Sequence, residues 1–231
     1  MPRFLQILPG ALSWFTLALA VFLSWAAPAV VAVLIILFDI YWLLKTVYLL
    51  LHLKHTFSEM KKNLEICWLG KLREAKAAGD KKLGRWREIY HLVIIPIYKE
   101  PYEVVQESFA SLAASNYPKG RLMVVLAAEE RGGEEAALVA RRIEKEFSDK
   151  FFKFLVTTHP ANLPGEIPGK GSNESWAAER AREKIIDPLR LKHENIITSV
   201  FDADTQAPPE YFGRLTFVFL SSPNPLRAIY Q

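Results

Sequence analysis

Two carboxylates, one residue apart, follow a strand-like run near the end of the sequence. The run Ile196–Val200 is apolar and rich in β-branched residues, and Phe201-Asp202-Ala203-Asp204 comes directly after it. Because residues i and i+2 of a strand point the same way, Asp202 and Asp204 would reach one cation together or through its water. Carboxylates suit Mg²⁺ or Mn²⁺, and strand ends in α/β sheets bind phosphate-bearing ligands. The alternative is a solvated turn with an aspartate cap, and spacing alone leaves both open.

The elements that would position this pair form an α/β pattern. Beyond Tyr90, short apolar runs alternate with helical stretches, and the sequence shows no internal repeats. We expect strands at 91–97, 122–127, 151–157 and 196–201, and helices at 102–114, 134–147 and 172–186. Strands separated by helices imply right-handed crossovers, so we predict a doubly wound, mainly parallel, Rossmann-like sheet.

Each expected strand delivers polar residues to its carboxyl end. The first leads into Tyr98-Lys99-Glu100-Pro101, and the second into Glu129-Glu130-Arg131-Gly132-Gly133. Taken singly, these signals are weak. Glu100 could instead cap the following helix, because the helix dipole favours a carboxylate near its N-terminus, and Glu129 with Glu130 could be a solvated loop. Taken together, the strand ends hold the groups that bind a nucleotide diphosphate through a divalent ion.

The third strand leads into a loop that contains Gly169-Lys170-Gly171-Ser172-Asn173. The glycines let the backbone approach a ligand, and a helix that starts near Ser172 would present free amides. This arrangement suits a diphosphate. It differs from a Walker loop, in which Ser or Thr follows the lysine, because Gly171 follows Lys170 here.

The first part of the chain is apolar enough for the membrane. The chain has 231 residues, is 51% apolar and has a net charge of +4, which allows one globular domain plus an extra segment. Between Phe4 and Leu53 the charged side chains are Asp39 and Lys45. We therefore expect a helical hairpin over 1–53, with membrane helices near 11–27 and 29–51. A bent or interfacial helix pair is the alternative, and Asp39 could mark a functional path or pack against a partner helix.

A basic segment, 54–90, follows the apolar hairpin and is expected to be a helical juxtamembrane linker. By the positive-inside rule it lies in the cytoplasm, so the protein would be a multi-pass protein of the inner, or cytoplasmic, membrane. Trp68 and Trp86 suit an interfacial position, and the cations could also bind anionic lipid headgroups. The adjacent membrane helices argue against nucleic-acid binding. Cys67 is the single cysteine, so no disulfide forms within the chain, and we interpret it as structural.

Three motifs resemble those of a known enzyme family, the inverting family 2 glycosyltransferases. They are Ile94–Pro101, Gly169–Asn173 and Phe201–Asp204, which occur in the family's order and approximate spacing. The likeness covers 91–231, and the preceding helices look like those of membrane-bound polysaccharide synthases. The resemblance implies a partial GT-A domain over 91–231 that transfers a sugar from a UDP- or GDP-sugar to a glycan or lipid acceptor.

The resemblance also implies roles for individual residues. Glu100, Glu129 and Glu130 fall where the family contacts base and ribose, although the second strand end departs from the commoner Asp-Asp-Gly sequence. Asp202 and Asp204 fall on the Asp-x-Asp motif, which binds Mg²⁺ or Mn²⁺ at the diphosphate. The full predicted donor site is Pro96, Tyr98, Glu100, Glu129, Glu130, Lys170, Asp202 and Asp204. His159 and Asn173 belong to the same loop region and are expected to order it.

The family's general base is a carboxylate well downstream of Asp-x-Asp, and the sequence offers no candidate for it. Only 27 residues follow Asp204, and Glu210 lies too close to the motif. We therefore expect a C-terminally truncated enzyme that is inactive alone, completed by a polypeptide that supplies the acceptor half.

Two other functions compete with glycosyl transfer. One is a non-catalytic membrane protein that binds a nucleotide or a partner through a degenerate GT-A domain. The other is a nucleotidyltransferase that acts on sugar phosphates, which would carry a glycine-rich loop after its first strand. Tyr98-Lys99-Glu100-Pro101 contains no glycine.

Overall fold

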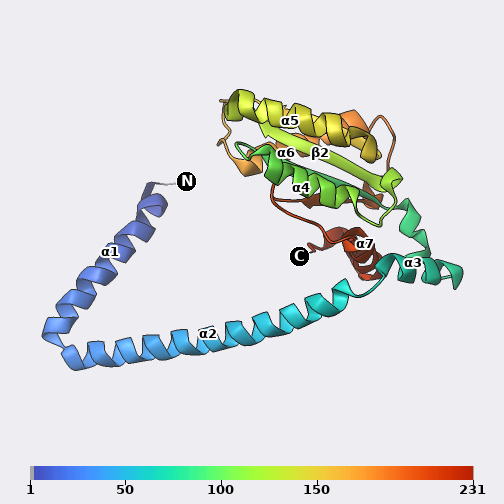
Figure 1. The fold of residues 1–231 in the computed structure, drawn as a ribbon. Coiled ribbons are helices and arrows are strands. Elements are labelled where there is room, and N and C mark those ends of the chain that lie inside the picture. Colours follow the sequence, from blue (N-terminus) through green and yellow to red (C-terminus); the bar gives the residue numbers. More distant parts are fainter. Residues whose placement is uncertain (1–2, 231) are drawn as a thin grey trace. The chain divides into compact units, whose positions relative to one another are not determined.

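The computed structural model describes residues 3–230 and divides the chain into two compact units. These units are Met1–Asn63 and Leu64–Gln231. The first consists of two long helices, and the second contains the sheet (Figure 1).

The first unit consists of α1 (Arg3–Ala26) and α2 (Pro28–Leu64), both long and apolar enough to cross a membrane. Pro28 begins α2, where a missing N–H costs no hydrogen bond. Both helices are longer than predicted. α1 begins at Arg3 instead of near Ala11, and α2 continues past Leu51 because good helix formers such as Lys61 and Lys62 follow the apolar run. At 37 residues α2 is about 55 Å long, well beyond a hydrocarbon core of about 30 Å.

The second unit is built on a four-stranded, fully parallel sheet in the order β3-β2-β1-β4. The strands are β1 (Tyr90–Ile97), β2 (Leu122–Glu129), β3 (Lys153–His159) and β4 (Ile196–Val200). All four predicted strands are therefore present, with ends shifted by at most two residues. The prediction of an α/β fold, with a parallel sheet that follows two apolar helices in the sequence, is confirmed.

Helices cover both faces of this sheet. They are α4 (Tyr102–Ala113), α5 (Gly133–Phe147), α6 (Lys170–Ala181) and α7 (Tyr211–Ser221). Val93 and Val124 face the core formed with α4, α5 and α7. Their neighbours Leu92 and Met123 face the core formed with α6. Burial on both faces explains why the central strands are continuous apolar runs.

The segment predicted as a separate linker, 54–90, is not one. Its first part belongs to α2, and the rest forms α3 (Trp68–Ala77) and the short helix η1 (Leu83–Glu88) inside the second unit. Trp86 is 1% exposed and Trp68 is 8% exposed. The interfacial position predicted for both tryptophans is therefore wrong, because the Trp86 side chain belongs to the hydrophobic core and the Trp68 ring packs against Phe217 of α7. In Figure 1, α3 lies beside α7.

Candidate functional site

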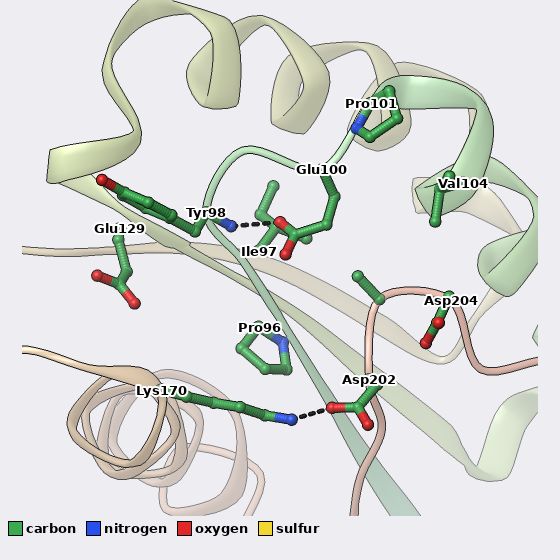
Figure 2. A pocket seen from close by; sticks show the side chains of 11 residues that line it. Pro96, Ile97, Tyr98, Glu100, Pro101, Val104, Glu129, Lys170, Asp202 and Asp204 are labelled. Atoms are coloured by element: carbon green, nitrogen blue, oxygen red, sulfur yellow. Dashed lines mark hydrogen bonds and ion pairs between the residues drawn. The ribbon is translucent and has the colours of Figure 1, made fainter.

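A pocket of about 440 Å³ opens where β1, β2 and β4 end. Figure 2 shows side chains from these strand ends and from the start of α6 around one space. Seven of the eight predicted donor-site residues line it, namely Pro96, Tyr98, Glu100, Glu129, Lys170, Asp202 and Asp204. The fold therefore brings together residues that are more than a hundred positions apart in the sequence.

Asp202 and Asp204 lie on the same side through a turn and not through strand geometry. β4 ends at Val200, and the Thr205 N–H donates to the Asp202 carbonyl over 3.0 Å. Ala203, between the aspartates, is buried, and its carbonyl accepts a 2.6 Å hydrogen bond from the Ser108 hydroxyl on α4. Since Ala203 is held inward, both carboxylates are exposed at the pocket.

Lys170 is the first residue of α6 and also lines the pocket, so this helix begins at the pocket's edge. Its ammonium donates to Asp202 (Figure 2) and lies 3.8 Å from Glu174. The hydrogen bond to Asp202 raises the pKa of Lys170, while partial burial acts in the opposite direction. The first amides of α6, which have no partner within the helix, add partial positive charge at the same edge.

Glu100 holds its own loop and does not cap α4. Its carboxylate accepts backbone hydrogen bonds from Tyr98 at 2.6 Å and Lys99 at 3.1 Å. The N-cap of α4 is Pro101, with no side-chain cap. Glu100 therefore orders the turn that leaves β1 while remaining on the pocket wall.

Glu129 is 7% exposed and forms an ion pair with Arg131. The Arg131 guanidinium lies 5.4 Å from the centre of the Tyr98 ring. These contacts join the end of β2 to the loop after β1. Gly132 allows the two to meet, because a Cβ atom there would lie 2.3 Å from the Tyr98 carbonyl oxygen.

Glu130 is the predicted site residue that this pocket does not include. Its carboxylate accepts a 2.7 Å hydrogen bond from the Ala161 N–H and lines a separate hollow beside α5. Glu130 directly follows β2, and its carboxylate orders the loop after β3 instead of facing the pocket.

His159 and Asn173, which are expected to order the loop region, are both buried and hydrogen-bonded. His159 is 5% exposed and lies 3.2 Å from the Glu166 carboxylate. Asn173 is fully buried and donates from Nδ2 to the Ala127 carbonyl over 2.7 Å, which ties α6 to β2. Glu210, which the sequence analysis excludes as a general base, holds the start of α3. Its carboxylate accepts a 2.9 Å hydrogen bond from the Leu69 N–H.

The donor set fits a cation whose remaining ligands come from a substrate. Asp202 and Asp204 are exposed carboxylates at the same turn, and their oxygens suit Mg²⁺ or Mn²⁺. Within residues 3–230, no group of three or more acidic, His or Cys side chains forms a metal cage. Two carboxylates plus substrate phosphates and water is a common way in which proteins hold Mg²⁺.

Two residues that hold the pocket's lining in place, Arg131 and Ser108, are not predicted from the sequence. The sequence pattern places Arg131 in a loop, and its position two residues after Glu129 is the signal that an ion pair could form. Ser108 interrupts the apolar face of α4, where a buried hydroxyl needs a partner, and that was the available signal.

Comparison with known proteins identifies no family for the chain. No protein-family model matches the sequence, and no curated protein matches it. Among solved structures, the crystal structure of S. aureus TarS 1-349 overlaps 57% of this chain, with 20% identity and a TM-score of 0.40. The overlap spans 32% of that chain, about a third of its length.

Proposed function

We propose that this chain is the donor-binding part of a membrane-anchored, inverting glycosyltransferase of the family 2 type, with a GT-A domain. The observation that carries the proposal is the gathering of seven predicted donor-site residues around one pocket. The ligand proposed for it is a UDP- or GDP-sugar. A pocket of about 440 Å³ falls within the range of roughly 300–1,000 Å³ that is usual for small-molecule sites.

The roles follow from charge and position. Asp202 and Asp204 would hold Mg²⁺ or Mn²⁺, which neutralises charge on the nucleotide diphosphate when it is bound. Lys170 and the first amides of α6 would bind phosphate oxygens, so Lys170 would exchange its bond to Asp202 for one to the ligand. Tyr98, Glu100 and Glu129 would contact the base and ribose, against the wall that Pro96 forms.

Inverting transfer requires a general base that takes the proton of the acceptor hydroxyl. We assign this role to no residue between 3 and 230. Glu100 and Glu129, the other pocket carboxylates, are engaged by backbone amides and by Arg131. The proposed chemistry of this chain is therefore donor binding, with a further polypeptide segment supplying the base and the acceptor site.

The proposed location is the inner, or cytoplasmic, membrane. α1 and α2 would cross the bilayer, and the sheet unit would lie in the cytoplasm. Their length and apolar composition support this proposal.

Calorimetry with UDP and GDP in the presence of Mn²⁺ tests donor binding. We expect at least one nucleotide to bind the wild-type chain, and Asp202→Ala with Asp204→Ala to weaken that binding at least about a hundredfold, since charged contacts are lost. A matched control, Glu65→Ala with Asp149→Ala, removes two exposed carboxylates outside the pocket and should bind like the wild type. Equal binding by both double variants would refute the assignment.

A non-catalytic nucleotide-binding protein is the second candidate. The observation that favours it is the Lys170 ammonium on Asp202, which competes with a cation for that carboxylate. Release of sugar from a UDP- or GDP-sugar, measured with the polypeptide that is proposed to supply the base and the acceptor site, separates the two. Binding without turnover under those conditions would favour the second candidate.

A further inference from the structure

The excess positive charge of this protein is concentrated in one short segment. The chain has 29 Lys and Arg against 25 Asp and Glu. Residues 68–89, which contain α3 and η1, hold 7 and 3 of these, which leaves 22 of each sign elsewhere. The net charge of +4 is therefore the net charge of this segment. The seven cations are Lys71, Arg73, Lys76, Lys81, Lys82, Arg85 and Arg87.

Among the described residues, six of these seven cations have no ion-pair partner, and one of the six, Lys82, donates a 2.9 Å hydrogen bond to the Ser222 carbonyl. The Asp80 carboxylate accepts hydrogen bonds from the backbone N–H groups of Lys82 and Leu83 at 2.8 Å, and it forms no ion pair with the cations of the segment. Glu88 pairs with Arg85 at 2.9 Å. Within the described part of the chain, Arg73 and Lys81 have no ion-pair partner, and both are exposed.

Part of the segment forms the rim of a hollow with an apolar floor. The hollow measures about 500 Å³, and Lys81, Lys82 and Arg85 line it. Its apolar lining consists of Ile89, Phe219, Leu220, Pro225 and Leu226. Glu194 is the carboxylate among the lining residues. Leu226 is 67% exposed, so apolar surface lies in solvent beside the three cations.

This hollow is distinct from the candidate donor site. Its residues come from η1 and the positions on either side of it, from Glu194 and Asn195 just before β4, and from the end of α7 with the segment after it. The donor pocket lies instead at the carboxyl ends of the strands. The two lie at opposite ends of the parallel sheet and share no lining residue.

Cations around an apolar floor match an anion that carries hydrocarbon. A nucleic acid would fit less well, because single-strand binding uses exposed aromatic platforms and the segment's aromatic rings, Trp68 and Trp86, are buried. The apolar part of α2 ends near Leu53, so residues 54–67 separate it from the start of α3. A bilayer that holds α2 is therefore the nearest large anionic surface along the chain.

We propose that the hollow and its rim of Lys81, Lys82 and Arg85 bind the headgroup of an anionic phospholipid, with Leu226 and its neighbours in contact with acyl carbons. The inference rests on the proposed membrane insertion of α1 and α2, and it does not depend on sugar transfer. The lipid contact would fix the orientation of the sheet unit on the membrane surface.

Amine labelling of the full chain in lipid nanodiscs tests the proposal. Labelling of Lys81 is compared between discs of neutral phosphatidylcholine and discs that contain about 30% phosphatidylglycerol, an anionic lipid. We expect labelling of Lys81 to fall at least about threefold in the anionic discs and to recover in about 0.5 M salt. Lys145, exposed on α5, is the internal reference and should label equally in both.

Two variants and a soluble anion sharpen the result. Arg85→Gln should reduce the protection of Lys81, whereas Arg141→Gln, which removes an exposed cation on α5, should retain it. Equal labelling in both discs would overturn the lipid proposal alone. Equal protection by inorganic phosphate in neutral discs would also overturn it, in favour of a free-phosphate site. Failure of the chain to enter either disc would overturn membrane insertion and this inference together.

Discussion

The two ends of β1 carry polar side chains in opposite surroundings. At its start, His91 is fully buried and its Nε2 lies 2.8 Å from the Thr216 hydroxyl on α7, with the Tyr117 ring 4.8 Å away. At its carboxyl end, the chain opens into the pocket with the exposed Asp202 and Lys170. At the buried end, the imidazole of His91 contacts a hydroxyl inside the core. At the open end, the charges of Asp202 and Lys170 are exposed and can bind a ligand.

The difference separates stability from binding. A buried polar group that loses its partner costs about 1–3 kcal/mol, because it cannot return to water. An exposed ion pair such as Lys170–Asp202 contributes about 0–1 kcal/mol. Substitutions near the start of β1 should therefore lower the free energy of unfolding, and substitutions in the pocket should lower nucleotide affinity.

The largest expected effect is on the acid stability of the buried end. Burial lowers the pKa of His91 from its ordinary 6.5 to about 3. The unfolded chain therefore takes up a proton below pH 6.5 that the folded chain refuses until about pH 3. The contribution of His91 to the free energy of unfolding is therefore fully present above pH 6.5. The free energy of unfolding should fall by up to about 1.4 kcal/mol per pH unit as the pH drops from 6.5 toward 3.

Urea unfolding at several pH values measures this slope. His91→Gln removes the titrating group and should flatten the dependence between pH 6.5 and 4, although other acidic groups contribute below that. An unchanged slope in the variant would assign the acid sensitivity elsewhere.

Gly132→Ala should lower both the free energy of unfolding and the nucleotide affinity, although Gly132 lies near the pocket end of β1. The added Cβ would lie 2.3 Å from the Tyr98 carbonyl oxygen, so the loop after β1 must shift. We expect a loss of about 1–3 kcal/mol in stability together with weaker nucleotide binding. Gly120→Ala, where no atom lies within 4 Å of the new Cβ, is the control, and equal behaviour of the two variants would contradict the prediction.

Thr216→Val should act at the buried end alone. The substitution leaves His91 Nε2 without its partner, so we expect a loss of about 1–3 kcal/mol in chemical unfolding and unchanged nucleotide binding. Thr198→Val, at an exposed position of β4, should change stability by less than about 0.5 kcal/mol. A neutral Thr216→Val would show that the His91 contact is not needed.

Lys170→Met should have the smallest effect on stability. Its ion pair is exposed, so the free energy of unfolding should change by less than about 0.5 kcal/mol. Nucleotide affinity should fall about tenfold or more in a binding titration, because a charged phosphate contact is lost. Lys192→Met, an exposed lysine outside the pocket, is the control for affinity, and a matching loss there would point to a general effect of charge.

Much of the sheet was predictable from sequence because its strands are short apolar runs with clear ends. The site was predictable to the extent that parallel strands bring their carboxyl ends to one edge. Glu130 could not be excluded, since the choice between adjacent glutamates depends on the turn after β2. The predicted strand geometry of Asp202 and Asp204 was wrong, yet the turn that replaces it also exposes both carboxylates.

The errors elsewhere share a physical cause. Segment 54–90 is predicted as a separate linker because many of its residues are exposed lysines and arginines. Leu69 and Leu72, which are buried and have the three-residue spacing of a helix face, are the signal that part of it belongs to the core. The sequence predicts His91 only as part of an apolar strand, because it does not reveal that Thr216, 125 residues later, lies beside the imidazole.

The most direct test of the central claim is the thermal unfolding midpoint of the sheet unit, measured in the full chain with and without UDP or GDP plus Mn²⁺. A ligand that binds the folded state raises this midpoint. We predict a rise in the wild type and in Glu65→Ala with Asp149→Ala, and no rise in Asp202→Ala with Asp204→Ala, whose ligand-free midpoint should match the wild type. No rise in the wild type with either nucleotide, or an equal rise in the Asp202 and Asp204 variant, would contradict the account.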